Sequence, residues 1–169
     1  MSFDWKRLST LDRVVAGGAA VVFIALFLPW WGVDIEGFSY SVDGWSAGFT
    51  AWAGGLLLTI AGVLLVLRRS GANISPANIG PSVLVVGIAA VGLLLVIIRW
   101  ASLPRYRGLG VGARYGLYIA LIAGIAELVA AVMAMRASGE PLPWAQTQSV
   151  ETPAEPAPPP PEAPATPEE

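Results

Sequence analysis

Apolar residues gather in four long runs that are separated by short polar connections. The runs cover residues 14–33, 47–67, 81–98 and 115–135. A helix that crosses a bilayer needs about 20 mainly apolar residues, because each residue rises about 1.5 Å through a hydrocarbon layer about 30 Å thick. The runs are apolar on all sides, as is typical of helices that face lipid. The pattern therefore predicts a transmembrane domain of four helices over residues 14–136.

The two ends of the chain have a different character. Residues 1–13 mix aromatic with basic side chains, which suits a segment at the headgroup level, and Ser9 and Asp12 have the spacing of a helix capping box. Residues 140–169 hold ten of the 14 prolines and six glutamates but no Lys or Arg. Such a stretch cannot bury a core, so residues 137–169 are expected to be a disordered acidic tail. The tail serves either as a spacer or as a proline-rich ligand for a cytosolic partner.

Composition agrees with lipid as the solvent of the chain. Of the 169 residues, 55% are hydrophobic and 13% are charged, whereas soluble domains carry about 25% charged residues. The chain has no Cys and no His, which removes disulfides, imidazole catalysis and the usual zinc, haem and iron–sulfur ligand sets. A net charge of −2 without a basic cluster gives nucleic-acid binding no support. We expect an all-α integral membrane four-helix bundle without a cofactor or enzymatic activity.

Basic residues predict the orientation in the membrane. Lys6, Arg7 and Arg13 precede the first run, whereas the loop that follows it has no Lys or Arg. Cytoplasmic segments are enriched in Lys and Arg, and the first helix usually dominates topology. We therefore expect a multi-pass plasma-membrane protein with both termini in the cytoplasm, although the arginines of the third loop favour the opposite orientation.

Aromatic residues lie mainly near the ends of the runs. Trp30 and Trp31 close the first run, and Trp45 directly precedes the second. Trp and Tyr are enriched at membrane–water interfaces. We therefore expect these side chains to be interface anchors and not ligand contacts.

The first and third loops carry opposite charges. The first holds Asp34, Glu36 and Asp43. The third holds Arg99, Arg105, Arg107 and Arg114. One interpretation is that the two loops pack together as a small extracytoplasmic cap, in which each exposed ion pair contributes at most about 1 kcal/mol. The other is that the arginines contact lipid phosphates.

A faint internal repeat relates two parts of the chain. Residues 44–71 and 112–139 align without a gap, and both end in the pattern Arg-x-Ser-Gly. A two-helix unit repeated in tandem keeps its orientation, so Arg68 and Arg136 would lie at the same membrane face. Small residues recur at every fourth position in the second and fourth runs, which lets helices approach closely in lipid.

Glu127 is the one charged side chain inside the runs. Its helical neighbours are Ala123, Gly124, Ala130 and Ala131, so this small-residue face is expected to meet another helix. Desolvation without a partner cation disfavours the charged form, so we expect a largely neutral carboxyl group at pH 7. In the repeat alignment Thr59 has the matching depth, which makes a Thr59–Glu127 hydrogen bond one interpretation. The alternatives are an ion-coupling carboxyl group and a docking point for a basic residue of a partner subunit.

Several features resemble those of known membrane proteins. The segment Phe27-Leu-Pro-Trp-Trp-Gly32, the later Gly44-Trp-Ser, the Pro/Glu tail and the use of nine Arg to one Lys resemble small four-helix membrane proteins of actinobacteria. The layout is similar to that of the mycobacterial 34 kDa antigen-like family, in which four helices precede a proline-rich tail. The resemblance implies a class of membrane protein and supplies no activity or site residues.

Two functions follow from these observations. The first is a non-catalytic accessory or scaffold protein that contacts lipids, a membrane-protein partner or a second copy, and presents its tail to the cytosol. The second is a small transporter or channel component that uses Glu127.

Overall fold

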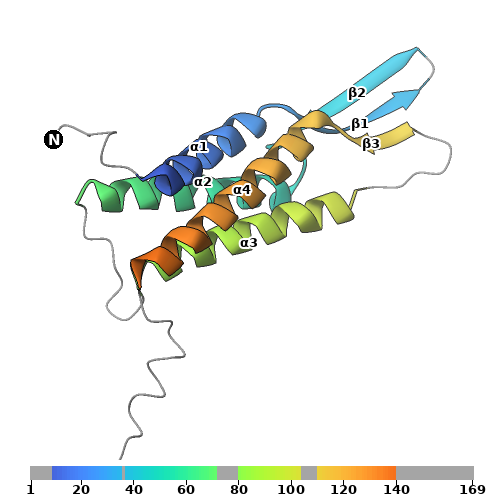
Figure 1. Cartoon of the computed structure of the whole chain (residues 1–169). Helices are drawn as coiled ribbons and strands as arrows, with labels where there is room; N and C mark the ends of the chain where they lie inside the picture. The colour runs from blue at the N-terminus through green and yellow to red at the C-terminus, as the bar shows by residue number, and fades with distance from the viewer. Residues whose placement is uncertain (1–8, 36, 72–79, 104–109, 140–169) are drawn as a thin grey trace, which may run out of the picture.

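The computed structural model of the chain describes residues 9–35, 37–71, 80–103 and 110–139. Within these residues the chain forms four helices and three strands (Figure 1). The helices are α1 (Thr10–Ala25), α2 (Phe49–Arg69), α3 (Pro81–Ala101) and α4 (Tyr115–Ser138). The strands are β1 (Pro29–Ile35), β2 (Phe38–Asp43) and β3 (Gly110–Ala113).

The helices form an antiparallel bundle with the sheet at one end. α1 and α3 run toward the sheet, and α2 and α4 run away from it (Figure 1). α1 and α3 each pack against both α2 and α4. In the part of the chain that the structure describes, α2, α3 and α4 are long and apolar enough to cross a membrane. α1 has 16 residues, which is fewer than the about 20 that a spanning helix needs.

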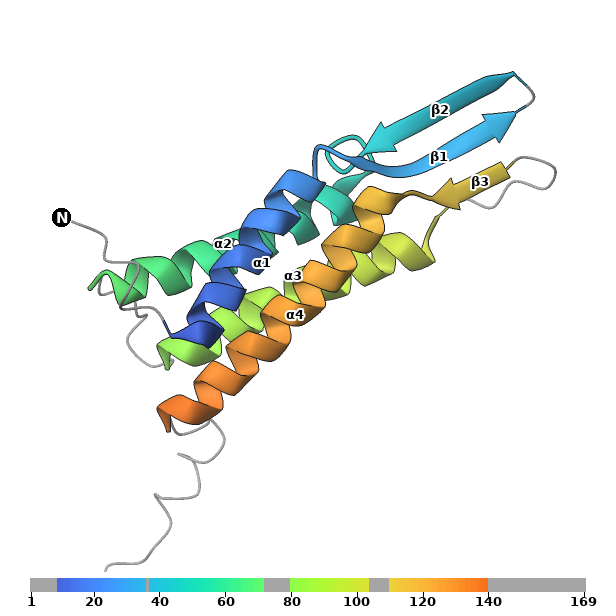
Figure 2. The ribbon, with the colours of Figure 1, turned by 45° about the horizontal axis from the view of Figure 1, so that its top comes forward.

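The small sheet corrects the expected all-α class. Its strand order is β2-β1-β3, and both neighbours pair antiparallel to β1. Val33 lies opposite Tyr40 on one side and Val111 on the other. The first and third loops, for which packing together was one of two interpretations, therefore meet through backbone pairing, and the β1–β2 hairpin projects past the helix ends (Figure 2).

The first apolar run divides into two elements, so the expected helix over residues 14–33 is wrong at its end. α1 ends at Ala25, and β1 begins at Pro29. Proline has no backbone N–H and clashes with a preceding helical turn, while the aromatic and β-branched residues that follow favour a strand. The indole N–H of Trp30, a fully buried side chain, donates to the Ala25 carbonyl at 2.7 Å and satisfies one helix-terminal acceptor. Trp30 is thus part of the core and not an interface anchor.

Glycines mark the places where the helices come closest. A Cβ added to Gly54 of α2 would lie 2.8 Å from the carbonyl oxygen of Gly92 in α3, and one added to Gly92 would lie 2.9 Å from the Gly54 oxygen. A Cβ on Gly62 of α2 would collide with the Ala19 side chain of α1. Small residues thus let the backbones touch, which is the packing that stabilises helix association in lipid.

Large apolar side chains cover much of the outer surface of the bundle. At least half-exposed examples are Val63, Val91, Leu94, Ile122, Ile125, Val129 and Met133. So many exposed large apolar side chains are unusual on a protein that faces water.

The start of α1 and the ends of α2 and α4 have capping patterns that can be recognised in the sequence. The predicted capping box is present, because the Ser9 hydroxyl accepts from the Asp12 N–H and the Asp12 carboxylate accepts from the Ser9 N–H, each at 3.1 Å. In the two aligned blocks, α2 and α4 are both followed by a glycine with positive φ, +92° at Gly71 and +66° at Gly139. This left-handed conformation suits glycine and ends a helix. Residues 1–8 and 140–169, which hold most of the predicted end segments, lie outside the described residues.

Candidate functional site

Glu127 lies in the middle of α4 and is fully buried in the bundle. The small face around it does meet another helix: a Cβ added to Gly18 of α1 would lie 3.0 Å from the Glu127 Cβ and 3.2 Å from the Ala123 carbonyl oxygen. Glycine at position 18 therefore allows α1 to cross α4 at the carboxylic side chain. A partner subunit cannot reach this group unless α1 moves, which weighs against the docking interpretation.

The hydrogen bond between Thr59 and Glu127, one of the interpretations of the sequence, is not formed. The Thr59 hydroxyl donates to the Gly55 carbonyl at 2.9 Å, within its own helix. Neither carboxyl oxygen of Glu127 has a hydrogen-bond partner among the described residues. The alignment placed the two residues at equal depth, but α2 and α4 are diagonal in the bundle and make few contacts. A buried carboxyl group without a partner is expected to be neutral, because an unpaired charge is costly in an apolar interior.

At the sheet end, Asp34 and Arg114 form an ion pair. The Arg114 guanidinium donates to Asp34 at 2.6 Å, and the Ser39 hydroxyl donates to the other carboxylate oxygen at 2.8 Å. The Arg114 hydrogen bond and then the Ser39 hydrogen bond hold the pKa of Asp34 below its usual range. Arg114 also precedes α4 and donates its backbone N–H to the Trp30 carbonyl at 2.8 Å. This residue therefore ties the fourth helix to β1.

The other predicted loop charges have separate roles. Arg99 belongs to the last turn of α3, and its guanidinium lies 5.9 Å from the ring centre of Trp31, a cation–π distance. Asp43 accepts from the Ser46 N–H at 2.8 Å and stabilises the turn before α2. The three remaining candidates, Glu36, Arg105 and Arg107, lie outside the described residues.

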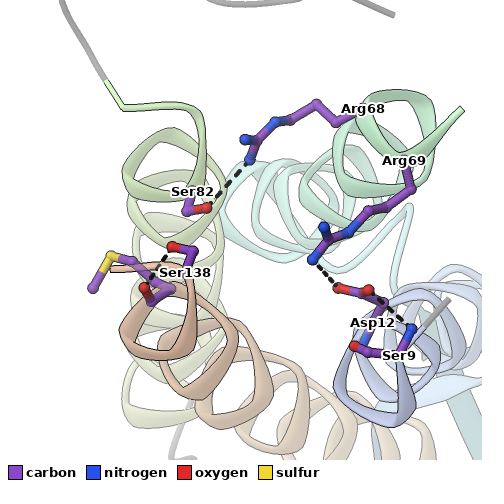
Figure 3. Close-up of polar contacts among 7 residues, drawn as sticks. Ser9, Asp12, Arg68, Arg69, Ser82 and Ser138 are labelled. Carbon is purple, nitrogen blue, oxygen red and sulfur yellow. Dashed lines mark hydrogen bonds and ion pairs between the residues drawn. The ribbon is translucent and has the colours of Figure 1, made fainter. Parts of the chain in front are cut away.

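The opposite end of the bundle holds a polar cluster that sequence reasoning missed (Figure 3). Arg69 of α2 donates to the buried carboxylate of Asp12 in α1 at 3.0 Å, and Arg68 donates to the Ser82 hydroxyl of α3 at 3.4 Å. The sequence held a signal for this cluster. The alternating topology places the start of α1, the end of α2 and the start of α3 at one end, where charges of opposite sign can meet.

The described residues contain no group of three or more Asp and Glu side chains that could hold a metal ion. The arrangement therefore consists of one isolated carboxyl group inside the bundle and a polar cluster at each end. Neither a family model, nor a curated protein, nor a solved structure matches the chain.

Proposed function

We propose that the chain is a non-catalytic accessory or scaffold protein of the plasma membrane, inserted through its helices and carrying a small docking sheet at one end. The observation that supports it best is the two-sided character of the hairpin. Val33, Ile35, Phe38 and Tyr40 share one face of the sheet, because cross-strand partners and alternate residues of a strand point the same way. Of these, Phe38 and Tyr40 are 64% and 54% exposed.

The opposite face of the same hairpin is polar or small. Asp34 lies opposite Ser39, and Gly32 lies opposite Ser41. A face with exposed aromatic and aliphatic residues, held rigid by β3 and the Asp34–Arg114 pair, suits recognition of a partner protein, since aromatic residues are enriched in interfaces. The predicted resemblance in layout to actinobacterial four-helix membrane proteins stays a prediction and does not identify the partner.

The test is affinity purification of the full chain in mild detergent from the membranes of its own cell. We expect a partner at stoichiometric amounts, lost on Phe38→Glu but retained on Ser41→Glu, which adds the same charge to the other face of the same strand. Equal loss with both variants, or a homo-oligomer that survives Phe38→Glu, would contradict docking through this face. A chain that stays soluble and compact without detergent would contradict the membrane class itself.

Coupling of a proton or cation to transport is the second candidate, favoured by the burial of Glu127 without a hydrogen-bond partner in the described part of the chain. Intramembrane carboxyl groups of this kind mark ion pathways in other membrane proteins. In proteoliposomes, Glu127→Gln should abolish proton-dependent flux, whereas Thr59→Ala should leave it unchanged, because Thr59 bonds within its own helix. Absence of flux in the unmodified protein excludes this candidate.

A further inference from the structure

β2 forms one edge of the small sheet. The strand order β2-β1-β3 leaves one side of β2 without a neighbouring strand. The six residues of β2 pair with β1, and the register shift between the two strands lies at Pro29–Trp31, next to the bundle. Among the described residues, no backbone hydrogen bond from outside the sheet reaches Phe38–Asp43. The outer side of β2 is therefore open to a further strand.

The direction of the backbone groups in β2 follows from a close approach within the sheet. A Cβ added to Gly32 of β1 would lie 2.6 Å from the Tyr40 carbonyl oxygen, so this oxygen points toward β1. In an antiparallel pair the N–H and C=O groups of one residue point to the same side, and those of the next residue point to the other side. The backbone groups of Ser39 and Ser41 therefore point away from β1. They present two donors and two acceptors at the free edge.

β2 lacks the features that usually protect an edge strand from pairing. Lysine, proline, bulges and inward-pointing charges block such edges in natural proteins. The segment Phe38-Ser-Tyr-Ser-Val42 contains no lysine, no proline and no charged residue, and its first four residues are exposed. Apolar and polar side chains alternate along it, so an added strand would extend both faces of the sheet. The edge is thus built for pairing by its backbone and by its side-chain pattern.

We infer that β2 binds an extended segment of a partner protein as a fourth strand of the sheet, an inference that rests on the proposed docking function. In strand addition, main-chain hydrogen bonds supply affinity and alternate side chains supply specificity. The segment that fits has an apolar residue at every second position, because these side chains would lie beside Phe38 and Tyr40. Its other residues are small or polar and would lie beside Ser39 and Ser41.

The chain itself supplies no strand that fits this edge. α1 runs toward the sheet and α4 runs away from it, so Ser9 and Gly139 both lie at the other end of the bundle, across the proposed membrane (Figure 1). The hairpin extends along the length of the bundle, so antiparallel pairing of two β2 strands would turn the two bundles in opposite directions (Figure 2). Parallel pairing about an axis along the bundle would place the apolar face of one hairpin beside the polar face of the other. A segment of a different protein meets none of these restrictions.

The experiment uses a fluorescent peptide that copies residues 38–43. A free peptide can lie antiparallel to β2, with its Tyr opposite Tyr40 and its two Ser residues opposite Ser39 and Ser41. Its binding to the full chain in detergent is measured by fluorescence anisotropy. We expect Ser41→Pro to weaken binding at least about tenfold, because it removes an outward N–H group and leaves the pairing with β1 intact. The matched control Ser41→Ala keeps this N–H group and should bind as tightly as the unmodified chain.

Backbone methylation of the peptide tests the same contact without changing the protein. Methyl groups on the nitrogens of its two Ser residues should abolish binding, because these nitrogens would face β2. A methyl group on the nitrogen of its Tyr, which would face away, should leave binding unchanged. Equal binding of both methylated peptides, or no binding of the unmethylated peptide, would overturn strand addition even if Ser41→Pro fails to fold.

Co-purification separates this inference from the docking function on which it rests. A partner lost in Phe38→Glu but retained in Ser41→Pro would contradict strand addition alone, because docking through the apolar face would remain. A partner retained in both variants would contradict the docking function itself. A homodimer that is lost in Ser41→Pro would assign the edge to a second copy of the chain and overturn the partner segment.

Discussion

Gly18 is the residue that lets α1 lie against the buried carboxyl side chain of α4. A methyl group at this position would approach the Glu127 Cβ and the Ala123 carbonyl oxygen to 3.0 and 3.2 Å. We expect Gly18→Ala to destabilise the fold by about 1–3 kcal/mol through overpacking. Its neighbour Gly17 has no atom within 4 Å of the added Cβ, so Gly17→Ala should be neutral or slightly stabilising. Unfolding in mixed micelles, followed by circular dichroism, measures both, and equal stability of the two variants would contradict the contact.

The ion pair at the sheet makes a prediction about pH. Asp34 has a pKa below its ordinary value of 3.8, chiefly because Arg114 donates a hydrogen bond to it. The stabilisation from this pair is therefore complete above the unfolded-state pKa and is lost as the pH falls through the lower folded-state pKa. Arg114→Gln should raise the pKa of Asp34 toward 3.8, and a carboxyl-carbon NMR titration reads this directly. We expect no change in stability from this pair between pH 7 and pH 5. An unchanged pKa of Asp34 in Arg114→Gln would show that Ser39 alone sets this pKa.

At the scale of single residues, the sequence indicated that Glu127 is buried but not what it faces. The small residues on both sides of it in α4 were a usable signal, because only a close neighbour makes use of such a face. The identity of that neighbour depends on how α1 is rotated and shifted against α4. The alignment with α2 carried no information on the rotation or the shift of α1. It therefore pointed to Thr59, whereas the contact is with Gly18.

At the scale of elements, apolar run length predicted α2, α3 and α4 well but misjudged the end of α1 and missed all three strands. Hydropathy does not distinguish a buried strand from the end of a helix, so the first run was extended through Pro29. The segment Gly110–Ala113 has low strand propensity because of its glycines, and pairing with β1 makes it a strand. Proline followed by two tryptophans was the available signal for the change from helix to strand.

The change from α1 to β1 depends on Trp30, which gives a second prediction of stability. Trp30→Phe removes the indole donor from the Ala25 carbonyl, which keeps the Leu28 N–H as a donor at 3.1 Å, so we expect the loss of this hydrogen bond to cost about 0.5–1.5 kcal/mol in addition to the lost volume. The control is Trp45→Phe, since the buried indole N–H of Trp45 has no hydrogen-bond partner among the described residues. We expect the control to lose only packing, and denaturation followed by the fluorescence of the remaining tryptophans compares the two. If Trp45→Phe lost more stability than Trp30→Phe, ring volume alone would explain the loss and the hydrogen bond would contribute nothing.

At the scale of the whole molecule, the alternating direction of the helices places the sheet at one end and the Arg68–Arg69 cluster at the other. In a membrane these ends face different compartments. The excess of basic residues at the start of the chain predicts that the cluster faces the cytoplasm and the sheet faces the outside. The four arginines of the third loop are weaker evidence for the opposite orientation than the sequence alone indicated, because Arg99 contacts Trp31 and Arg114 pairs with Asp34.

The absence of cysteine from the chain makes this topology directly measurable. Ser41→Cys places a thiol on the exposed hairpin, and Ala137→Cys places one on the exposed end of α4. A membrane-impermeant maleimide added to whole cells should label the first variant, and should label the second only after the membrane is permeabilised. Labelling in the reverse order would invert the predicted orientation and place the sheet in the cytoplasm. Labelling of both variants in intact cells would require an even number of crossings between residues 41 and 137, so at least one of α2, α3 and α4 would lie outside the membrane.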